Sequence, residues 1–309
     1  MIAPVRNEEH TLAALLDSLL AQTVAADEIV LADGGSTDGT VALARSYADR
    51  GVRLLEIGQA YPGRGRNAAI QAARNDWVAL IDGGCQAEPS WLENLIASRE
   101  VLGPEPGVIF GECRPRLVNE WDVAQALACI GPPDPVTGAH PRVVPSSLLH
   151  RAVWQRIGGF PEDLRAAEDL LFMKRLDEWR IPTSRSPKAV IRWRLAAGPG
   201  GVWRRFRLYS AHHLAAGLYE TWHLRVMAMD LAALGLLGAA AVWTAAIPLL
   251  GLAVLTRLLL TVARRRNNVP NRRAFRPDRL LRVALLLLLA DAAMWVGALD
   301  RVLGREPPR

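Results

Sequence analysis

The pattern of apolar and polar positions changes about two-thirds of the way along the chain. Through residues 1–215, short apolar runs alternate with stretches in which leucine and alanine recur at helical spacing. The apolar runs predict strands over residues 1–3, 28–32, 53–57, 77–81, 108–113 and 189–193. The helical stretches predict helices over residues 9–21, 40–50, 67–73, 90–101, 152–157, 168–179 and 201–218. Strands that alternate with helices on short loops are typical of an α/β fold with a doubly wound, mostly parallel sheet.

The last third of the chain, residues 216–309, is predicted to be a membrane region. Residues 226–263 are almost wholly apolar, and this stretch is nearly twice the length of about 20 residues that one spanning helix needs. We therefore expect a tight helical hairpin that turns near Thr244–Pro248. A basic loop follows over residues 264–282, and a third apolar segment over residues 283–299. The length of this third segment is compatible both with a crossing and with a helix that lies in the interface.

Arginines flank both ends of the expected hairpin. Arg204, Arg205 and Arg225 precede it, and a cluster that starts at Arg264 follows it. The positive-inside rule places both flanks in the cytoplasm, so an even number of crossings separates them. The pattern predicts a multi-pass protein of the inner membrane whose first domain faces the cytoplasm. The alternative interpretation is that the apolar segments are buried helices of a soluble protein.

Composition and charge narrow the range of partners. The net charge is +6 and the isoelectric point is near 9.8, a balance that fits nucleic acid, an anionic membrane surface or phosphorylated substrates. The basic residues cluster beside the apolar segments, which favours membrane lipids. The sequence contains no helix-turn-helix or zinc-finger pattern, so we expect no nucleic acid. Three widely spaced cysteines make neither a disulfide framework nor a zinc motif, and a reducing cytosol is the simplest environment for the first domain.

Two carboxylates fall at the ends of predicted strands. Asp33 follows residues 28–32 and Asp82 follows residues 77–81, and a pair of glycines comes after each. In an open parallel sheet, ligands bind in the crevice at the carboxyl ends of the strands. Hard cations such as Mg²⁺ and Mn²⁺ bind carboxylate oxygens together with substrate phosphates. The two positions therefore predict a nucleotide and metal site, although aspartate before glycine is also common in simple turns.

Five short motifs follow one another along the first domain. They are Pro4-Val5-Arg6-Asn7-Glu8, Asp33-Gly34-Gly35-Ser36-Thr37-Asp38, Gly63-Arg64-Gly65-Arg66-Asn67, Asp82-Gly83-Gly84 and Glu168-Asp169. In this order they resemble the motifs of family 2 glycosyltransferases, over about residues 1–215, and the chain is similar to the bacterial membrane-anchored branch of that family. The resemblance implies a GT-A fold, a nucleotide-diphosphate sugar donor and inversion at the anomeric carbon.

Position by position, the resemblance assigns roles to the donor-binding residues. The nucleoside pocket would be lined by Pro4, Arg6, Glu8 and Asp33. Asp38 would steady the loop that follows Asp33. The diphosphate or the ribose would lie near Arg64, Arg66 and Asn67. The alternative interpretation of Arg64 is a residue of a solvated turn.

Asp82 matches the first carboxylate of the family's Asp-x-Asp metal motif. Gly84 stands where the second aspartate usually lies, so fewer protein groups hold the metal. Substrate phosphates and water complete the coordination shell at many Mg²⁺ sites. We therefore expect a divalent cation, Mg²⁺ or Mn²⁺, at Asp82.

Glu168 and Asp169 are the candidates for catalytic chemistry. The pair opens a predicted helix, where carboxylates are favourable for structural reasons alone. The resemblance implies instead that Asp169 is the general base, which must come within hydrogen-bond reach of the acceptor hydroxyl. Glu168 would orient the substrate or the base.

The sequence thus predicts an inverting, membrane-anchored glycosyltransferase that acts on a lipid-linked or membrane-surface acceptor in envelope glycan synthesis. One alternative is a polyprenyl-phosphate sugar synthase, whose lipid phosphate acceptor needs no strong base. The other is a non-catalytic, nucleotide-binding membrane scaffold, an idea that the missing second aspartate motivates.

Overall fold

The computed structural model of the 309-residue chain describes residues 1–134, 136–137, 139–219, 223–240, 243–244, 246–269 and 274–305. Contacts divide the chain into two compact units. Unit 1 comprises Met1–Arg114 and Ala139–Arg194, and unit 2 comprises Pro115–Gly138 and Leu195–Arg309. The division falls after Arg194 rather than at residue 215, because helix α9 (Gly198–Ala215) packs within unit 2.

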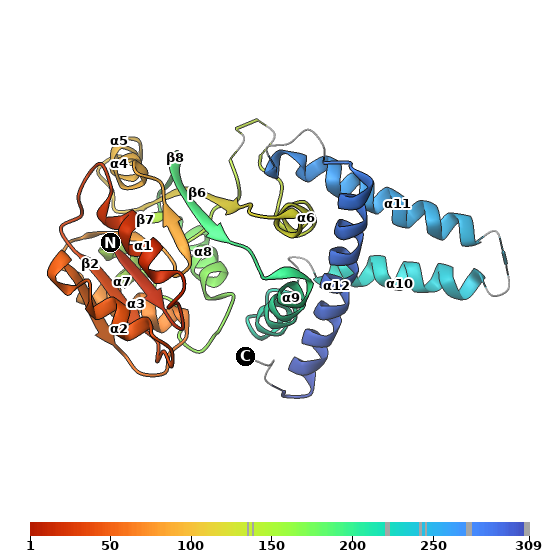
Figure 1. Ribbon diagram of the computed structural model, residues 1–309, viewed down its shortest axis with the longest axis horizontal. Helices are drawn as coiled ribbons and strands as arrows, with labels where there is room; N and C mark the ends of the chain where they lie inside the picture. The colour runs from red at the N-terminus through yellow and green to blue at the C-terminus, as the bar shows by residue number, and fades with distance from the viewer. Residues whose placement is uncertain are drawn as a thin grey trace. The chain divides into compact units, whose positions relative to one another are not determined.

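Unit 1 is built on one mixed sheet. Its strands are β1 (Ile2–Val5), β2 (Ile29–Asp33), β3 (Val52–Glu56), β4 (Trp77–Leu80), β5 (Cys85–Ala87), β6 (Val108–Arg116), β7 (Ser147–His150) and β8 (Thr183–Arg194), and their spatial order is β3-β2-β1-β4-β7-β6-β8-β5. β3, β2, β1 and β4 run parallel, whereas β7 is antiparallel to β4 and β6, and β5 to β8. The predicted α/β fold is confirmed. The sheet forms the centre of unit 1 (Figure 1), and the carboxyl ends of β1, β2 and β4 lie at the same end of it because these neighbouring strands are parallel.

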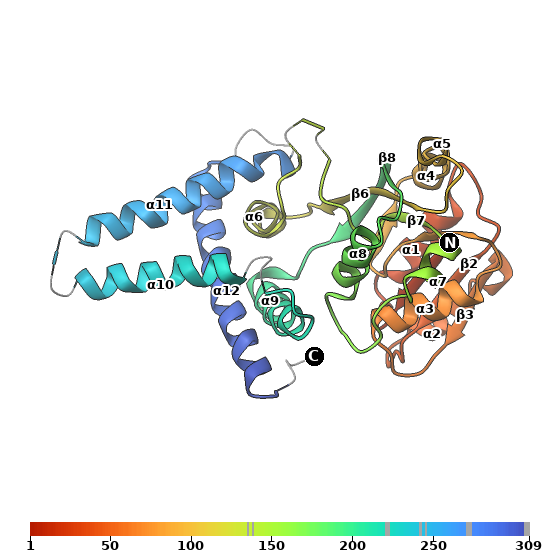
Figure 2. The same cartoon turned by 180° about the vertical axis from the view of Figure 1, so that it is seen from behind.

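Helices cover both faces of this sheet. They are α1 (Leu12–Leu20), α2 (Thr40–Arg45), the 3-10 helix η1 (Ala48–Arg50), α3 (Pro62–Ala72), α4 (Trp91–Ala97), α5 (Arg99–Leu102), α7 (Arg151–Arg156) and α8 (Glu168–Glu178). Residues of α1, α2 and α4, including Leu15 and Trp91, pack in the core on one face. Residues of α3, α7 and α8, including Ile70 and Phe172, pack in the core on the other (Figure 2).

Helix α3 begins earlier than the sequence predicted. The glycine-rich segment around Gly63 and Gly65, expected to be a turn, lies inside α3, whose first residue is Pro62. Proline is favoured at the first helical position because its missing N–H is not needed there. A Cβ atom at Gly63 would collide with the carbonyl oxygen of Pro161, and one at Gly65 would lie 2.9 Å from the Cβ atom of Pro4. Close backbone approach, rather than turn formation, therefore requires these glycines.

Unit 2 is helical. Its helices are α6 (Glu120–Cys129), α9, α10 (His223–Ala240), α11 (Ala246–Arg265), the 3-10 helix η2 (Arg266–Asn268) and α12 (Pro277–Val302). α10 and α11 pack against each other as a hairpin. The turn was expected near Thr244–Pro248, but α11 already begins at Ala246 and contains Pro248. The third apolar segment is longer than expected, since α12 already starts at Pro277. Helical structure also enters the segment expected to be a basic loop, of which residues 270–273 lie outside the described residues.

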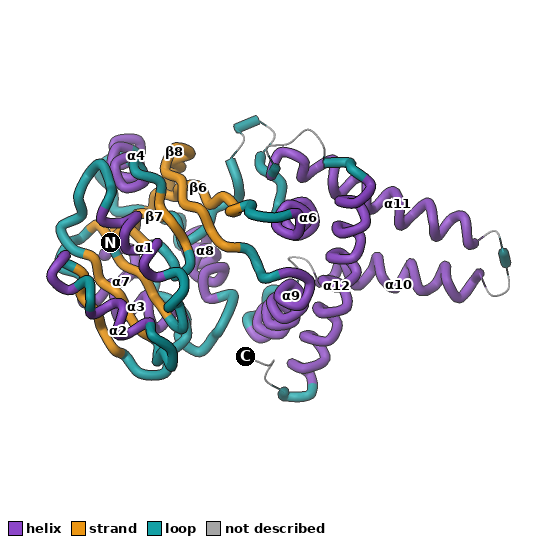
Figure 3. The backbone as a smooth tube through the Cα atoms, viewed as in Figure 1, coloured by secondary structure: helices purple, strands orange, loops and turns teal. Residues whose placement is uncertain are grey.

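Within unit 2, α12 packs along α9 and α6 (Figure 3). Leu127 of α6, Val202 of α9, and Val283 and Leu286 of α12 belong to one buried apolar cluster. By contrast, α10 and α11 pair with each other and expose large apolar side chains along their length. These include Leu231, Leu234, Leu237, Leu252, Leu255 and Leu260.

Three helices of unit 2 are long and apolar enough to cross a membrane, judged by length and composition. They are α10, the helical stretch Ala246–Asn268, and α12. Burial of apolar surface away from water is the main favourable term in folding and association, so a hairpin that exposes this many leucines requires an apolar surrounding. The described helices therefore indicate membrane anchoring.

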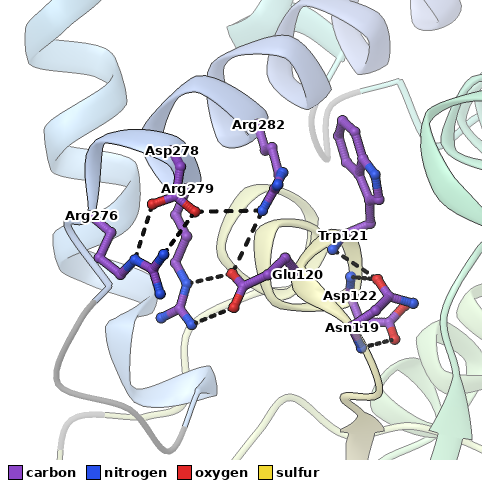
Figure 4. Close-up of polar contacts among 8 residues, drawn as sticks. All are labelled: Asn119, Glu120, Trp121, Asp122, Arg276, Asp278, Arg279 and Arg282. Atoms are coloured by element: carbon purple, nitrogen blue, oxygen red, sulfur yellow. Dashed lines mark hydrogen bonds and ion pairs between the residues drawn. The ribbon is translucent and has the colours of Figure 1, made fainter.

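A network of ion pairs joins the start of α12 to α6 (Figure 4). Arg279 donates two hydrogen bonds to the carboxylate of Glu120, at 2.7 and 2.9 Å. Arg282 lies 3.8 Å from the same carboxylate, and Asp278 pairs with Arg276 at 3.0 Å. This face of α12 is therefore polar at its amino-terminal end, although most of the helix is apolar.

Candidate active site

Arg66 of α3 lies at the centre of the candidate site. Its side chain is only 3% exposed. Nη2 donates to both carboxylate oxygens of Asp82, at 2.7 and 2.8 Å, and Nη1 donates to Oε1 of Glu168 at 2.6 Å. Burial alone lowers the pKa of Arg66, but the charges of Asp82, Glu168 and Asp169 raise the pKa above its usual value. The guanidinium is therefore permanently charged, and it ties the loop after β4 to the first turn of α8.

Asp169 lies beside this ion-pair cluster. Part of the residue stays accessible, but desolvation of its carboxyl group, followed by the charge of Glu168, raises its pKa from 3.8 to about 6, against the opposing charge of Arg66. A base of this strength is deprotonated at neutral pH and still binds a proton well. Ala167, just before the pair, has a φ of 72°, a left-handed conformation that is strained for alanine. Strain of this kind is concentrated at functional sites.

Asp33 ends β2 and is 3% exposed. Its Oδ2 atom accepts hydrogen bonds from the backbone N–H groups of Gly35 and Ser36, both at 3.0 Å. Its Oδ1 atom accepts from the Ser36 hydroxyl at 2.5 Å. Each carboxylate oxygen has two lone pairs, so these bonds leave capacity for a further donor. Asp33 fixes its own loop at the strand end, and its contact with a nucleobase stays a prediction.

The loop after Asp33 is held by two further side chains. Oδ1 of Asp38 accepts from the amide and the hydroxyl of Thr40, at 3.0 and 2.5 Å, and Oδ2 accepts from the amide of Glu9 at 3.3 Å. Asn7, which the sequence reasoning did not single out, accepts from the amide of Thr37 at 2.8 Å. Its φ is 55°, a conformation in which asparagine is enriched. The loops after β1 and β2 are therefore joined by side-chain hydrogen bonds.

Asn67 and Arg64 lie near the site but differ in what they contact. The Asn67 side chain donates to the carbonyl of Phe160 at 2.9 Å and to Glu162 at 2.8 Å, and it accepts from Trp154 Nε1 and Phe160 N, both at 2.9 Å. These bonds hold the loop that leads to α8, a role that sequence reasoning missed. Arg64 is exposed, so its side chain is accessible to a ligand.

Glu8 lies beside the turn formed by Asp82, Gly83 and Gly84. A Cβ atom at Gly83 would lie 3.1 Å from Oε1 of Glu8, and one at Gly84 would lie 3.4 Å from Oε2. Burial raises the pKa of Glu8, and the charges of Asp38 and Asp82 add to this, although a hydrogen bond from Thr11 opposes it. The Glu8 carboxylate thus stands next to the position where the missing aspartate side chain would begin. Of the other predicted residues, Arg6 is half-buried after β1.

Asp82 and Glu8 together fit a hard divalent cation. Mg²⁺ is commonly bound through one or two carboxylates together with substrate phosphates. The Asp82 side chain is 29% exposed, and its oxygens keep lone pairs beyond the contacts with Arg66. Among the described residues, no group of three or more His, Cys, Asp or Glu forms a complete metal cage. A divalent cation at Asp82 stays a prediction.

Residues 1–121 match the family model described as glycosyl transferase family 2. Residues 1–121 are therefore similar to family 2 glycosyltransferases, and this segment is called the family 2 domain below. The matched residues include Glu8, Asp33, Arg66 and Asp82, whereas Glu168 and Asp169 lie beyond the match. The family 2 domain thus contains the carboxyl ends of β1, β2 and β4, and Arg66 links it to the pair on α8.

Curated relatives of the family 2 domain match over a similar length. The succinoglycan biosynthesis protein ExoO of Rhizobium meliloti is 34% identical over 103 residues, which are 33% of this chain and 30% of that protein. The dodecaprenyl-phosphate galacturonate synthase of Rhizobium johnstonii is 32% identical over 107 residues, 32% of each chain. The matched segment of this chain therefore spans about a third of the length of these relatives.

A solved structure shares the fold over nearly the whole chain. The mannosyltransferase PcManGT from Pyrobaculum calidifontis, determined in complex with GDP-Man and Mn²⁺, aligns with 99% of this chain and 87% of its own, at 20% identity and a TM-score of 0.66. At this identity the likeness shows the fold alone. The family 2 domain therefore has the GT-A architecture that its motifs predicted.

Proposed function

We propose that the chain is an inverting glycosyltransferase that moves a sugar from a nucleotide-diphosphate sugar to a hydroxyl of a membrane-associated or lipid-linked acceptor. The observation that carries the proposal is the cluster of Arg66, Asp82, Glu168 and Asp169 at the carboxyl end of the sheet in a family 2 domain. Ligands of open α/β sheets bind at that end of the strands.

In the proposed reaction, Asp169 takes the proton of the acceptor hydroxyl while the acceptor oxygen attacks the anomeric carbon. The bond to the nucleoside diphosphate breaks in the same displacement, which inverts the configuration at that carbon. Arg66 holds Glu168 and Asp82 in fixed positions on either side, so it positions the base rather than touching the sugar. A divalent cation bound at Asp82 and Glu8 would stabilise the charge of the leaving diphosphate.

The remaining donor contacts belong to the residues at the neighbouring strand ends. We assign Pro4, Arg6 and Asp33 to the nucleoside pocket, and the exposed Arg64 to the diphosphate, where a guanidinium makes charge-assisted hydrogen bonds. Asp38 and Asn67 act through the loops that they hold.

The first test is donor binding by the full-length protein. We expect one class among UDP-, GDP- and dTDP-sugars to raise the melting temperature and to release nucleotide in the presence of Mg²⁺ or Mn²⁺, since the protein groups at the metal position are incomplete without phosphate. The Asp82→Ala and Glu8→Gln variants should each weaken the metal-dependent part of the binding. The exposed Asp163→Ala change in the same unit serves as the matched control.

The outcomes of this screen separate the candidate functions. Binding and turnover that require metal and Asp82 support the glycosyltransferase. Binding of a donor with no transfer and no hydrolysis under either metal favours a non-catalytic, nucleotide-binding scaffold. Binding that is equally tight in Asp82→Ala with and without metal would contradict the assignment of the metal position.

The pH dependence of activity is a second test. Below pH 6, kcat/KM should fall tenfold for each pH unit and should level off above it, because the pKa of Asp169 is raised to about 6 and a protonated carboxyl cannot accept a proton. Initial rates at low donor concentration, measured from roughly pH 5 to pH 8, give this dependence of kcat/KM on pH. A rate that stays constant through this range would exclude Asp169 as the base.

The second candidate function is a polyprenyl-phosphate sugar synthase. It is favoured by the similarity to a dodecaprenyl-phosphate galacturonate synthase and by the apolar helices of unit 2. A lipid phosphate is already anionic, so it attacks the sugar without a strong base. In either case we place the family 2 domain on the cytoplasmic side of the inner membrane, in contact with membrane lipids, and the similarity to a succinoglycan biosynthesis protein supports a role in envelope glycans.

A further inference from the structure

The three apolar helices of unit 2 do not run side by side. α10 and α11 pack along each other, whereas α12 runs across this pair (Figures 1 and 3). α12 packs mainly against α9 and α6. Three helices that each cross a bilayer would share one rough direction, since each must cover its thickness of about 30 Å. The crossed arrangement therefore separates α12 from the hairpin.

Side-chain contacts fix the level at which α12 meets the hairpin. Arg257 of α11 lies 2.6 Å from a carboxylate oxygen of Asp291 on α12 and 3.7 Å from one of Asp230 on α10. Trp295 of α12 donates a hydrogen bond to Asp230 at 2.8 Å. This level lies partway along both hairpin helices rather than at their ends.

The length of hairpin beyond this level is short. α10 continues from Asp230 to Ala240, and α11 begins at Ala246 and reaches Arg257. At a rise of about 1.5 Å for each residue, both helices project roughly 15 Å beyond the contact with α12. This distance is about half the thickness of the hydrocarbon core.

The other side of α12 carries charges that belong near water. Arg207 of α9 pairs with Asp300 of α12 at 2.5 Å, and Arg279 of α12 pairs with Glu120 of α6 at 2.7 Å (Figure 4). If the hairpin tip reached the far surface of the bilayer, α12 and these ion pairs would lie near the bilayer centre. Charged side chains are most costly there, so this placement is unfavourable.

The face of α12 that meets the hairpin is apolar and exposed. Leu281, Leu285, Leu288, Leu299 and Val302 are exposed. They are three, four or eleven residues apart, spacings that place them in line with Trp295 on one face of the helix. The end of α11 and the start of η2 add the exposed Arg264 and Arg266. An apolar helix face next to basic residues matches the boundary between acyl chains and anionic headgroups.

We propose that unit 2 is monotopic: α12 lies in the plane of the membrane, and the α10–α11 hairpin enters a single leaflet without crossing it. The occupant of the exposed apolar surface is thus one leaflet of a lipid bilayer. This arrangement puts both arginine-rich flanks of the hairpin on the same side, as two crossings also would, so the charge pattern of the sequence agrees with both. The inference does not depend on the reaction that unit 1 catalyses.

The test is the depth of spin labels in the full-length protein, reconstituted in liposomes that contain anionic lipid. Labels are attached to Thr244→Cys near the hairpin tip and to Leu234→Cys on α10, both exposed positions. The monotopic arrangement places the Thr244 label deeper, near the bilayer centre, by roughly 9 Å at the rise of a helix. The unsubstituted protein, which retains Cys85, Cys113 and Cys129, gives the labelling background.

A crossing hairpin gives the reverse order. The Leu234 label would then be deeper than the Thr244 label, and the Thr244 thiol would react with an impermeant reagent from the far side, which would overturn the proposal. Labels that stay exposed to water at both positions would overturn it as well.

A second pair of labels tests α12 by itself. Leu281→Cys and Leu299→Cys lie at opposite ends of its exposed face, so an in-plane helix gives the two labels similar depths. A helix that crosses the bilayer would separate them by roughly 27 Å along the membrane normal. A depth difference of that size would contradict the in-plane placement even if the hairpin labels agreed with it.

Discussion

Replacing Asp169 by asparagine is expected to lower kcat with hydroxyl acceptors by roughly 100- to 10,000-fold, the range that a general base contributes. The amide has nearly the same shape as the carboxylate, but it does not accept a proton. Donor affinity should change little, because the proposed donor contacts lie in the loops after β1, β2 and β4 and at Arg64 of α3, not on α8. Single-turnover transfer rates and donor titrations on the same preparation measure the two effects separately.

The matched control is Asp163→Asn, the same chemical change at an exposed position in the loop before α8. It should leave the transfer rate unchanged. The acceptor class decides between the two enzyme hypotheses. Asp169→Asn should lower transfer to a hydroxyl by the factor given above but leave much of the transfer to a polyprenyl phosphate. Full activity of Asp169→Asn with a hydroxyl acceptor would show that another group takes the proton.

The Arg66→Met variant is expected to destabilise unit 1 by about 3–5 kcal/mol, the usual cost of removing one partner from a buried ion pair. The change keeps the apolar stem and removes the positive charge that pairs with both Asp82 and Glu168. The melting temperature of the full-length protein in detergent should fall on the order of 10 °C. Transfer activity should fall with it, because Arg66 holds the first turn of α8 in position.

Two further variants separate charge from geometry. Arg64→Met makes the same change two residues away, at an exposed position of α3, and should shift the stability by less than about 0.5 kcal/mol. Arg66→Lys keeps a positive charge but lacks the planar fork that reaches both carboxylates, so we expect an intermediate melting temperature. Equal stability of Arg66→Met and Arg64→Met would show that the ion-pair cluster does not stabilise the fold.

Local pattern was enough to predict much of the fold. The alternation of apolar runs and helical stretches predicted the parallel strands, because each element buries one face or stripe that the sequence itself encodes. The local pattern was insufficient at α3, because it suggested that Gly63 and Gly65 were turn residues. Their reason is close contact with Pro161 and Pro4, which are distant in sequence, and no local pattern reports such a contact.

The candidate site shows the same division. Position in the chain predicted that Asp33 and Asp82 would lie at strand ends, and they do. Arg66 and Asn67 were predicted to lie near the diphosphate or the ribose, and these donor contacts stay predictions. The structure adds that Arg66 pairs with carboxylates and that Asn67 holds the loop around Phe160. A long polar side chain can reach several partners, and its choice depends on which elements the fold brings next to it.

The sequence by itself determined the class of this protein: an α/β domain with carboxylates at its strand ends, followed by a region apolar enough for a membrane. Both follow from periodicity and composition, which are local properties. Only the tertiary structure decided that Arg66 joins Asp82 to Glu168, which lies 102 residues after Arg66, and that α12 crosses the hairpin instead of running beside it. These outcomes depend on packing between distant segments. An apolar helix can bury its surface in several orientations, and the elements that pack against it determine which orientation it takes.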